Sequence, residues 1–200
     1  MVLHDFGDRD LAATVAGRDD HPWIRRLYLN DAVHLDLTAL APLRNLRELS
    51  VNRAKSVLPR LADQPALESV SIDADQVDLD LLAGRPSLWA LRLSGVTGPV
   101  STGPLRTLPA LTRLELAGLD VVDIEQVAEL PALRVLALDW DQWQRLRAAN
   151  AVPPGLAAAR LDGNTSLATA VDWATWLSQA CSARPPQLSA LTGTVYADRG

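Results

Sequence analysis

Leucine-rich segments with one apolar pattern recur along the chain, as in "LPALTRLELAG" at residues 108–118. In each segment, apolar residues occupy the first, fourth and sixth positions, and many of the residues between them are polar. The alternation from the fourth to the sixth position is typical of a short strand with one buried face. A single strand leaves its leucines exposed, so the pattern predicts a stack of such strands.

Seven copies of the segment lie in phase. They start at Ile24, Leu46, Leu67, Leu88, Leu111, Leu133 and Leu156, with 21 to 23 residues between successive starts, and the last copy is the weakest. Most copies have a proline two residues before their first apolar position, among them Pro65, Pro86, Pro109 and Pro131. Proline ends a helix and lacks the N–H that a ladder needs, so it favours a turn just before each strand.

This pattern resembles the leucine-rich-repeat family, in its short bacterial class of about 22 residues per repeat. The resemblance covers residues 23–162. It implies an α/β solenoid: a curved parallel sheet of about seven strands, an irregular or short-helical convex side, and a capping helix at the C-terminus. The family usually has Asn at the ninth position of each repeat, but here only Asn164 matches. We therefore expect irregular convex loops, for example over residues 94–104.

The repeat pattern predicts three parts of the chain. Residues 1–22 form an N-terminal lead-in with a short helix, residues 23–162 form the solenoid, and residues 163–200 form a capping helix and a tail. A further helix is predicted over residues 139–150, with Trp143 and Leu146 facing inward.

The predicted capping helix covers residues 166–181 and has one apolar stripe. The stripe contains Leu167, Ala170, Val171, Ala174, Leu177 and Cys181. Trp176 lies opposite its centre, which predicts that Trp176 contacts the tail or another chain.

Composition and charge limit the classes of function. The formal net charge of −5 argues against a general nucleic-acid binder. Charged residues interrupt every long apolar run, so no membrane span is predicted. Cys181 is the only cysteine and the N-terminal residues are acidic, where a signal peptide is basic and then apolar. A cytoplasmic location without an internal disulfide is the expectation.

No arrangement of residues predicts catalysis, a metal or a cofactor. His4, His21 and His34 have no metal-ligand spacing, and Cys181 belongs to the apolar helix stripe. Asp120, Asp123 and Glu125 are read as a solvated acidic loop. Phosphate-loop and nucleophile-elbow motifs are lacking. We therefore expect a protein that is not an enzyme.

The third and fifth positions of each copy should point outward from the concave sheet, and they hold four arginines and two glutamates. The second position, at the rim where each strand begins, is rich in arginine, whereas the seventh is acidic. Arg and Trp dominate the binding energy of many interfaces. The predicted partner-binding residues are Arg26, Tyr28, Arg47, Trp89, Arg92, Arg113, Glu115, Arg134 and Arg160.

The sequence thus predicts a non-enzymatic module that recognises a protein partner with an acidic patch, without a cofactor, nucleic acid or membrane. The family resemblance implies a more specific role, the ligand-sensing repeats of a bacterial NACHT-type signalling NTPase. Two alternatives stay open: an inhibitor or immunity protein that blocks an enzyme or toxin, and a structural scaffold.

Overall fold

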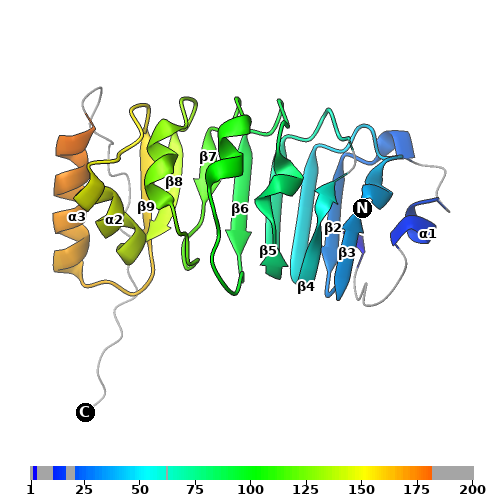
Figure 1. Cartoon of the computed structure of the whole chain (residues 1–200), viewed down its shortest axis with the longest axis horizontal. Helices are drawn as coiled ribbons and strands as arrows, with labels where there is room; N and C mark the ends of the chain where they lie inside the picture. Colours follow the sequence, from blue (N-terminus) through cyan, green and yellow to red (C-terminus); the bar gives the residue numbers. More distant parts are fainter. Residues whose placement is uncertain (1, 4–10, 17–20, 62, 182–200) are drawn as a thin grey trace, which may run out of the picture.

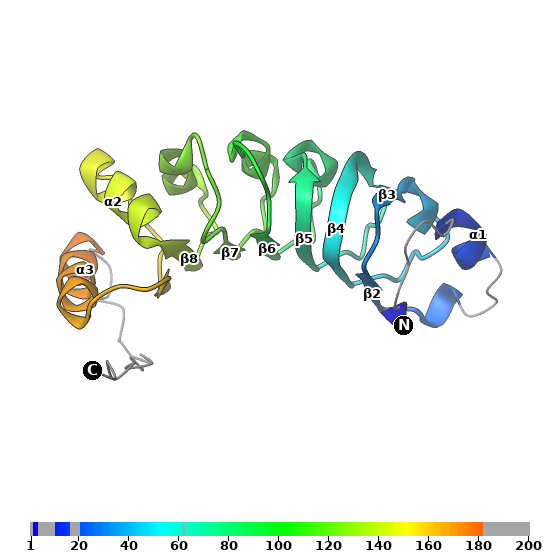
Figure 2. The ribbon, with the colours of Figure 1, turned by 90° about the horizontal axis from the view of Figure 1, so that it is seen from below.

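The computed structural model describes residues 2–3, 11–16, 21–61 and 63–181, which form one parallel sheet with helical segments on its outer side. Figure 1 shows the strands side by side, and Figure 2 shows that the sheet lines the inner side of an arc. The strands are β1 (Val2–Leu3), β2 (Arg26–Asn30), β3 (His34–Leu37), β4 (Glu48–Leu61), β5 (Ser69–Val77), β6 (Ala90–Ser94), β7 (Arg113–Glu115), β8 (Val135–Asp139) and β9 (Ala158–Asp162). Their order is β1-β2-β4-β5-β6-β7-β8-β9, and β3 pairs with β4.

The strand register follows the repeat phase of the sequence. Residues at the third position pair in one continuous row: Arg26, Glu48, Ser69, Ala90, Arg113, Val135 and Ala158. We call the strand segments that hold these residues rungs one to seven, on β2, β4, β5, β6, β7, β8 and β9. A slip of one residue would turn every leucine toward solvent, so burial of one face fixes this register. The predicted solenoid fold is confirmed.

The core consists of the apolar residues that successive rungs stack on one another. In rungs one to six, every residue at the fourth and sixth positions is at most 2% exposed. The leucines that precede the strands, such as Leu40, Leu43 and Leu46, are also fully buried. Burial of each such side chain contributes roughly 1.5–3 kcal/mol.

The sheet turns a corner near its N-terminal end, which the repeat pattern did not predict. Strand β4 continues beyond its rung, and its second half pairs with β3, where His34 lies opposite Ser56. The same half pairs with β5 from Ala54 opposite Ala74 onward, after a shift in register. Arg53, at this shift, has a left-handed backbone with φ of 55°. The first repeats therefore have a second short ladder beside the concave one.

Short helices occupy the convex side and the N-terminal end, as expected for an irregular solenoid. They are α1 (Leu11–Ala16), η1 (His21–Trp23), η2 (Thr38–Leu40), η3 (Leu79–Leu82), η4 (Gly103–Thr107), η5 (Ile124–Glu129), α2 (Trp140–Ala149) and α3 (Leu167–Ala180). Helix α2 buries Trp143 and Leu146 as predicted, and Asp139 caps its N-terminus together with Gln142.

None of the described helices combines the length and the apolarity that crossing a bilayer requires.

Helix α3 forms where predicted, but its buried face is shifted from the predicted stripe, of which Leu177, Ala174 and Cys181 pack in or against the core. Leu167 and Val171 are 70% and 50% exposed, whereas Trp173 and Leu177 are buried. The reason is aromatic packing: the rings of Trp173 and Trp176 lie 5.5 and 6.3 Å from that of Trp143 on α2.

The side chain of Trp176 is consequently half-buried, and the guanidinium of Arg147 lies 5.7 Å from the centre of its ring. Four tryptophans line a shallow hollow at the junction of α2 and α3: Trp140, Trp143, Trp173 and Trp176. The predicted contact between Trp176 and the tail involves residues outside the described ranges and stays a prediction.

Two glutamines bond backbone carbonyls of the preceding repeat. Gln142 donates to the carbonyls of Leu116 and Leu119 at 2.9 and 2.8 Å, and Gln64 donates to that of Leu40 at 2.6 Å. Two segments, at Leu40 and at 116–119, are therefore held by glutamine side chains from two different positions in the repeat.

The eighth position of the repeat turns the chain out of the sheet. Five of the seven residues there have a left-handed backbone: Asp31, Arg53, Gly95, Gly118 and Gly163. At Gly95, φ is +75° and a Cβ atom would lie 2.3 Å from Oδ1 of Asp73, so only glycine fits without a shift. The two exceptions are Ala74, where β5 continues, and Trp140, where α2 begins.

We expect Leu114→Asp to unfold the chain or its C-terminal half. Leu114 is fully buried in rung five, and an unpaired carboxylate there costs about 3–5 kcal/mol. Thermal unfolding followed by circular dichroism measures the effect. The matched control is Val122→Asp, because Val122 belongs to the same repeat and is 53% exposed. Equal melting temperatures for the two variants would contradict the assignment of this rung.

Candidate binding surface

The concave surface is built from the third and fifth positions of the rungs, whose side chains alternate with the buried leucines. Position three holds Arg26, Glu48, Ser69, Ala90, Arg113, Val135 and Ala158, and position five holds Tyr28, Ser50, Ser71, Arg92, Glu115, Ala137 and Arg160. The paired register aligns each set in one row across the sheet. Residues far apart in sequence therefore become neighbours on this surface.

Glu115 lies at the centre of a cluster of three arginines. Nε and Nη2 of Arg113 donate to its Oε1 at 2.8 and 2.6 Å. Nη2 of Arg160 donates to its Oε2 at 3.0 Å, and Nε of Arg92 lies 3.9 Å from the same oxygen. Arg160 comes from rung seven and reaches Glu115 on rung five, past the small side chain of Ala137. We call these four residues the arginine cluster.

The electrostatics of the cluster keep Glu115 ionised. Burial by itself raises the pKa of this carboxyl, which is only 7% exposed. The hydrogen bond from Arg113 and the charges of Arg160 and Arg113 outweigh burial, so the pKa lies below its ordinary value. Arg160 also donates to Asp162 from Nε and Nη2, both at 2.8 Å, and these bonds raise its pKa. Three cations thus surround two carboxylates, and a positive excess faces the concave side.

Arg92 is the most accessible arginine of the cluster. Its side chain is 61% exposed, compared with 50% for Arg160 and 48% for Arg113. Trp89 lies three residues earlier on the rim and is 44% exposed. Glu115 itself has little free area, so it acts mainly by orienting the arginines.

The remaining predicted residues lie outside this cluster. At the N-terminal end, the hydroxyl of Tyr28 donates to Glu48 at 2.7 Å, which raises the pKa of Tyr28, and Arg26 lies 3.9 Å from the other oxygen of Glu48. Small hydroxyl side chains on rungs two and three separate this group from the arginine cluster: Ser50, Ser69 and Ser71.

On the rim where the strands begin, Arg47 pairs with Glu68 at 2.6 Å. Arg134 donates to the backbone carbonyl of Gly155 at 3.0 Å, which ties the start of rung six to that of rung seven. The structure therefore brings together Arg92, Arg113, Glu115 and Arg160 but leaves these rim arginines apart.

Sequence reasoning missed the partners of two arginines. Arg113 and Glu115, like Arg160 and Asp162, are two residues apart in one strand and therefore share a face. Opposite charges two residues apart in a strand could therefore have predicted these two ion pairs from the sequence.

The acidic loop after rung five is held by internal contacts. Asp123 accepts hydrogen bonds from Ser101 at 2.7 Å and from the backbone and hydroxyl of Thr102 at 2.6 and 2.9 Å. Burial raises the pKa of Asp123, but these bonds outweigh it and lower the pKa. Glu125 pairs with Arg145 at 3.0 Å. Among the residues that the structure describes, no group of His, Cys, Asp and Glu is arranged to hold a metal ion.

Comparison with known proteins finds similarity among solved structures. No family model matches the chain, and no curated protein does. Among solved structures, the chain is similar to the crystal structure of an internalin from Listeria monocytogenes, with a TM-score of 0.38 and 17% sequence identity. The alignment covers 74% of this chain and 58% of the internalin chain, so this chain spans less than two thirds of that protein's length.

We expect Glu115→Gln to lower the free energy of unfolding by about 1–3 kcal/mol at pH 7, because three arginines lose their shared anion. The pKa of Glu115 is lower in the folded state than in the unfolded chain. Its stabilisation is therefore present above the unfolded pKa, about 4.3, and is lost as the pH falls through the folded pKa. Urea unfolding of both proteins between pH 3 and pH 7 measures the difference.

The control for this prediction is Glu68→Gln, which removes a more exposed ion pair with Arg47 and should cost less than about 1 kcal/mol. A difference between the wild type and Glu115→Gln that stays constant down to pH 3 would contradict the role of the carboxylate.

Proposed function

We propose that this protein is a non-enzymatic recognition module whose concave surface binds an acidic region of a protein partner. The observation that carries the proposal is the arginine cluster, in which three arginines converge on the single buried carboxylate of Glu115. Because Glu115 and Asp162 neutralise only part of this charge, the cluster attracts further anions.

The geometry of the cluster suits a carboxylate from a partner. Arginine binds carboxylates through two parallel hydrogen bonds, and Arg92 has most of its side chain free for this. Arg113 and Arg160 are already held in place by Glu115, so their ordering costs less on binding. The exposed ring of Trp89 adds apolar area beside the cluster.

The size of the surface also suits a protein. Seven strands about 4.8 Å apart give a face about 30 Å long. A typical stable interface buries about 800 Å² on each partner, and a face of this length accommodates it.

The more specific proposal, which follows from the family resemblance, is that the module senses a ligand for a bacterial NACHT-type signalling NTPase in the cytoplasm. An inhibitor of an enzyme or toxin and a structural scaffold are the competing roles. The native gene separates these roles: a reading frame that continues into an NTPase favours the sensor, and a neighbouring toxin gene favours the inhibitor.

We expect Arg92→Glu to weaken binding of the native partner by at least about 2 kcal/mol, or about 30-fold in Kd, because a like charge then faces the acidic patch. The free energy of unfolding should change by less than about 1 kcal/mol, since Arg113 and Arg160 still neutralise Glu115. The partner is first isolated by affinity capture with the wild-type chain and mass spectrometry, and then titrated against both proteins.

The matched control is Arg106→Glu, which changes the net charge equally but lies on the convex helix η4, where Arg106 pairs with Glu129 at 2.7 Å. Full affinity for Arg92→Glu, together with loss of affinity for Trp176→Ala, would move the binding site from the concave sheet to the α2–α3 junction.

A further inference from the structure

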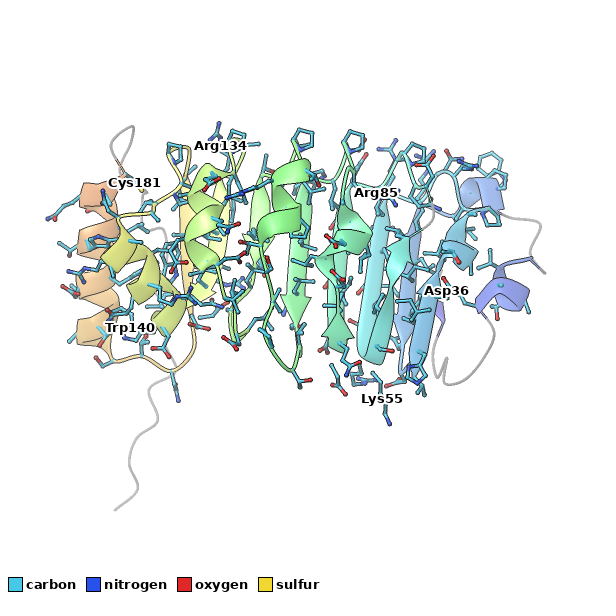
Figure 3. All side chains as sticks on the ribbon, in the orientation of Figure 1. Asp36, Lys55, Arg85, Arg134, Trp140 and Cys181 are labelled. Carbon is cyan, nitrogen blue, oxygen red and sulfur yellow. The ribbon has the colours of Figure 1, made fainter. Side chains whose placement is uncertain are left out.

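The shallow hollow between α2 and α3, which we call the tryptophan hollow, lies at the C-terminal end of the arc (Figures 1 and 2). Its lining consists of Trp140, Trp143, Gln144 and Arg147 from α2, and of Trp173 and Trp176 from α3. In Figure 3, Trp140 lies on the lower side of the molecule, where β8 ends and α2 begins. Four of the six tryptophans of the chain therefore gather in one place.

The four rings of the hollow differ in their access to solvent. Trp143 and Trp173 are buried, whereas Trp140 and Trp176 keep part of their side chains exposed. The ring of Trp143 makes angles of 60° and 71° with those of Trp173 and Trp176, an edge-on packing that is favourable for aromatic rings. The packed rings thus give the hollow a rigid apolar surface, and the two partly exposed rings give a ligand access to it.

The indole N–H groups of the hollow lack acceptors. The N–H of Trp143 donates to the carbonyl of Arg160 at 3.1 Å. The N–H of Trp173 is buried without an acceptor among the described residues, and Trp140 and Trp176 form no hydrogen bond within that part of the chain either. An indole donates only, and a buried donor without an acceptor is rare and destabilising. The hollow therefore favours a ligand that supplies acceptors together with apolar surface.

A proline-rich segment has the complementary chemistry. Proline lacks a backbone N–H, and a polyproline II helix has no internal hydrogen bonds, so its backbone presents acceptors only. Its rings supply the apolar surface, and aromatic grooves of several domain classes recognise such segments. The carbonyls of an α-helix are already bonded within the helix, and an extended strand brings N–H donors of its own. Helices and strands therefore match the hollow less well than polyproline does.

The charges around the hollow favour a basic residue next to the prolines. The guanidinium of Arg147 lies over the ring of Trp176 and pairs with Asp172 at 2.7 Å, so these two charges neutralise each other. Asp141, which follows Trp140 on α2, is exposed and has no cationic partner among the described residues. A lysine or arginine of the ligand is attracted by this carboxylate, and an acidic residue is repelled.

We propose that the tryptophan hollow binds a proline-rich segment of a partner protein, in the polyproline II conformation and with a basic residue beside the prolines. Such a helix advances about 3.1 Å per residue, so about three residues cross two packed helices whose axes lie about 8–10 Å apart. None of the residues that line the hollow belongs to the arginine cluster. The hollow is thus a second binding surface, and it prefers the opposite charge.

A synthetic peptide of two lysines followed by about eight prolines, a length of about 25 Å, tests the proposal with the full chain. We expect saturable binding in isothermal titration calorimetry. In NMR spectra, the indole N–H signals of Trp140, Trp173 and Trp176 should move downfield, because each N–H gains an acceptor. The signals of Trp23 and Trp89, which lie outside the hollow, should stay in place. Shifts confined to these two tryptophans, or no binding, would overturn the proposal.

Trp140→Ala is the test variant, because the ring contacts that join α2 to α3 run through Trp143 and persist without Trp140. We expect this variant to bind the peptide at least about tenfold more weakly than the wild type. The matched control is Trp89→Ala, which removes a 44% exposed tryptophan from the concave rim and should bind the peptide like the wild type. Equal affinities of the two variants would contradict the assignment of the site.

Three further peptides test the chemistry of the ligand. Glutamates in place of the two lysines should weaken binding, because they face Asp141. Glycine and serine in place of the prolines should abolish binding, since such a chain is flexible and carries N–H donors. A helical alanine-rich peptide with the same lysines should not bind either. Binding of the glycine–serine or the helical peptide as tight as that of the proline peptide would overturn the proposal.

Discussion

The structure depends on the burial of the fourth and sixth residues of each rung between its neighbours. Leu114 and Leu116 of rung five are fully buried in the core that the stacked rungs share, and Leu114 lies between Leu91 and Leu136 of the adjacent rungs. Each rung is therefore stable only within the stack, and its register is inherited from the rung before. The concave surface is a consequence, because its third and fifth positions alternate with residues that burial holds in place.

Rigid strands allow a charged network that a flexible loop would not support. Arg92, Glu115 and Arg160 come from rungs four, five and seven, and their backbone positions are set by the core beneath them. The entropy cost of bringing these charges together is thus largely met by folding. Because Ala137 is small, Arg160 reaches across a whole strand to Glu115. The pattern of large and small residues on the surface decides which charges meet.

The repeat phase, the strand register and the concave positions were predictable from the sequence because they follow from a strict period. The shift of the buried face of α3 was not predictable, since it results from the packing of Trp173 and Trp176 on Trp143, which is distant in sequence. The second ladder of β3 and β4 was not predicted either, because it is formed by residues that follow the leucine-rich segments of the first two repeats. For the candidate site, the surface was predictable, but the burial of Glu115 arises from three strands and needed the structure.

The shortest strand among the seven rungs lies near the middle of the solenoid. Strand β7 covers only Arg113–Glu115, and three residue pairs join it to each neighbour, whereas seven join β4 to β5. Under a pulling force along the arc, separation should begin at this point. The salt bridges of Glu115 connect β7 to β6 through Arg92 and to β9 through Arg160, so they reinforce this short strand on both sides. A partner that binds Arg92 and Arg160 at the same time would therefore raise the force needed to separate the rungs on either side of β7.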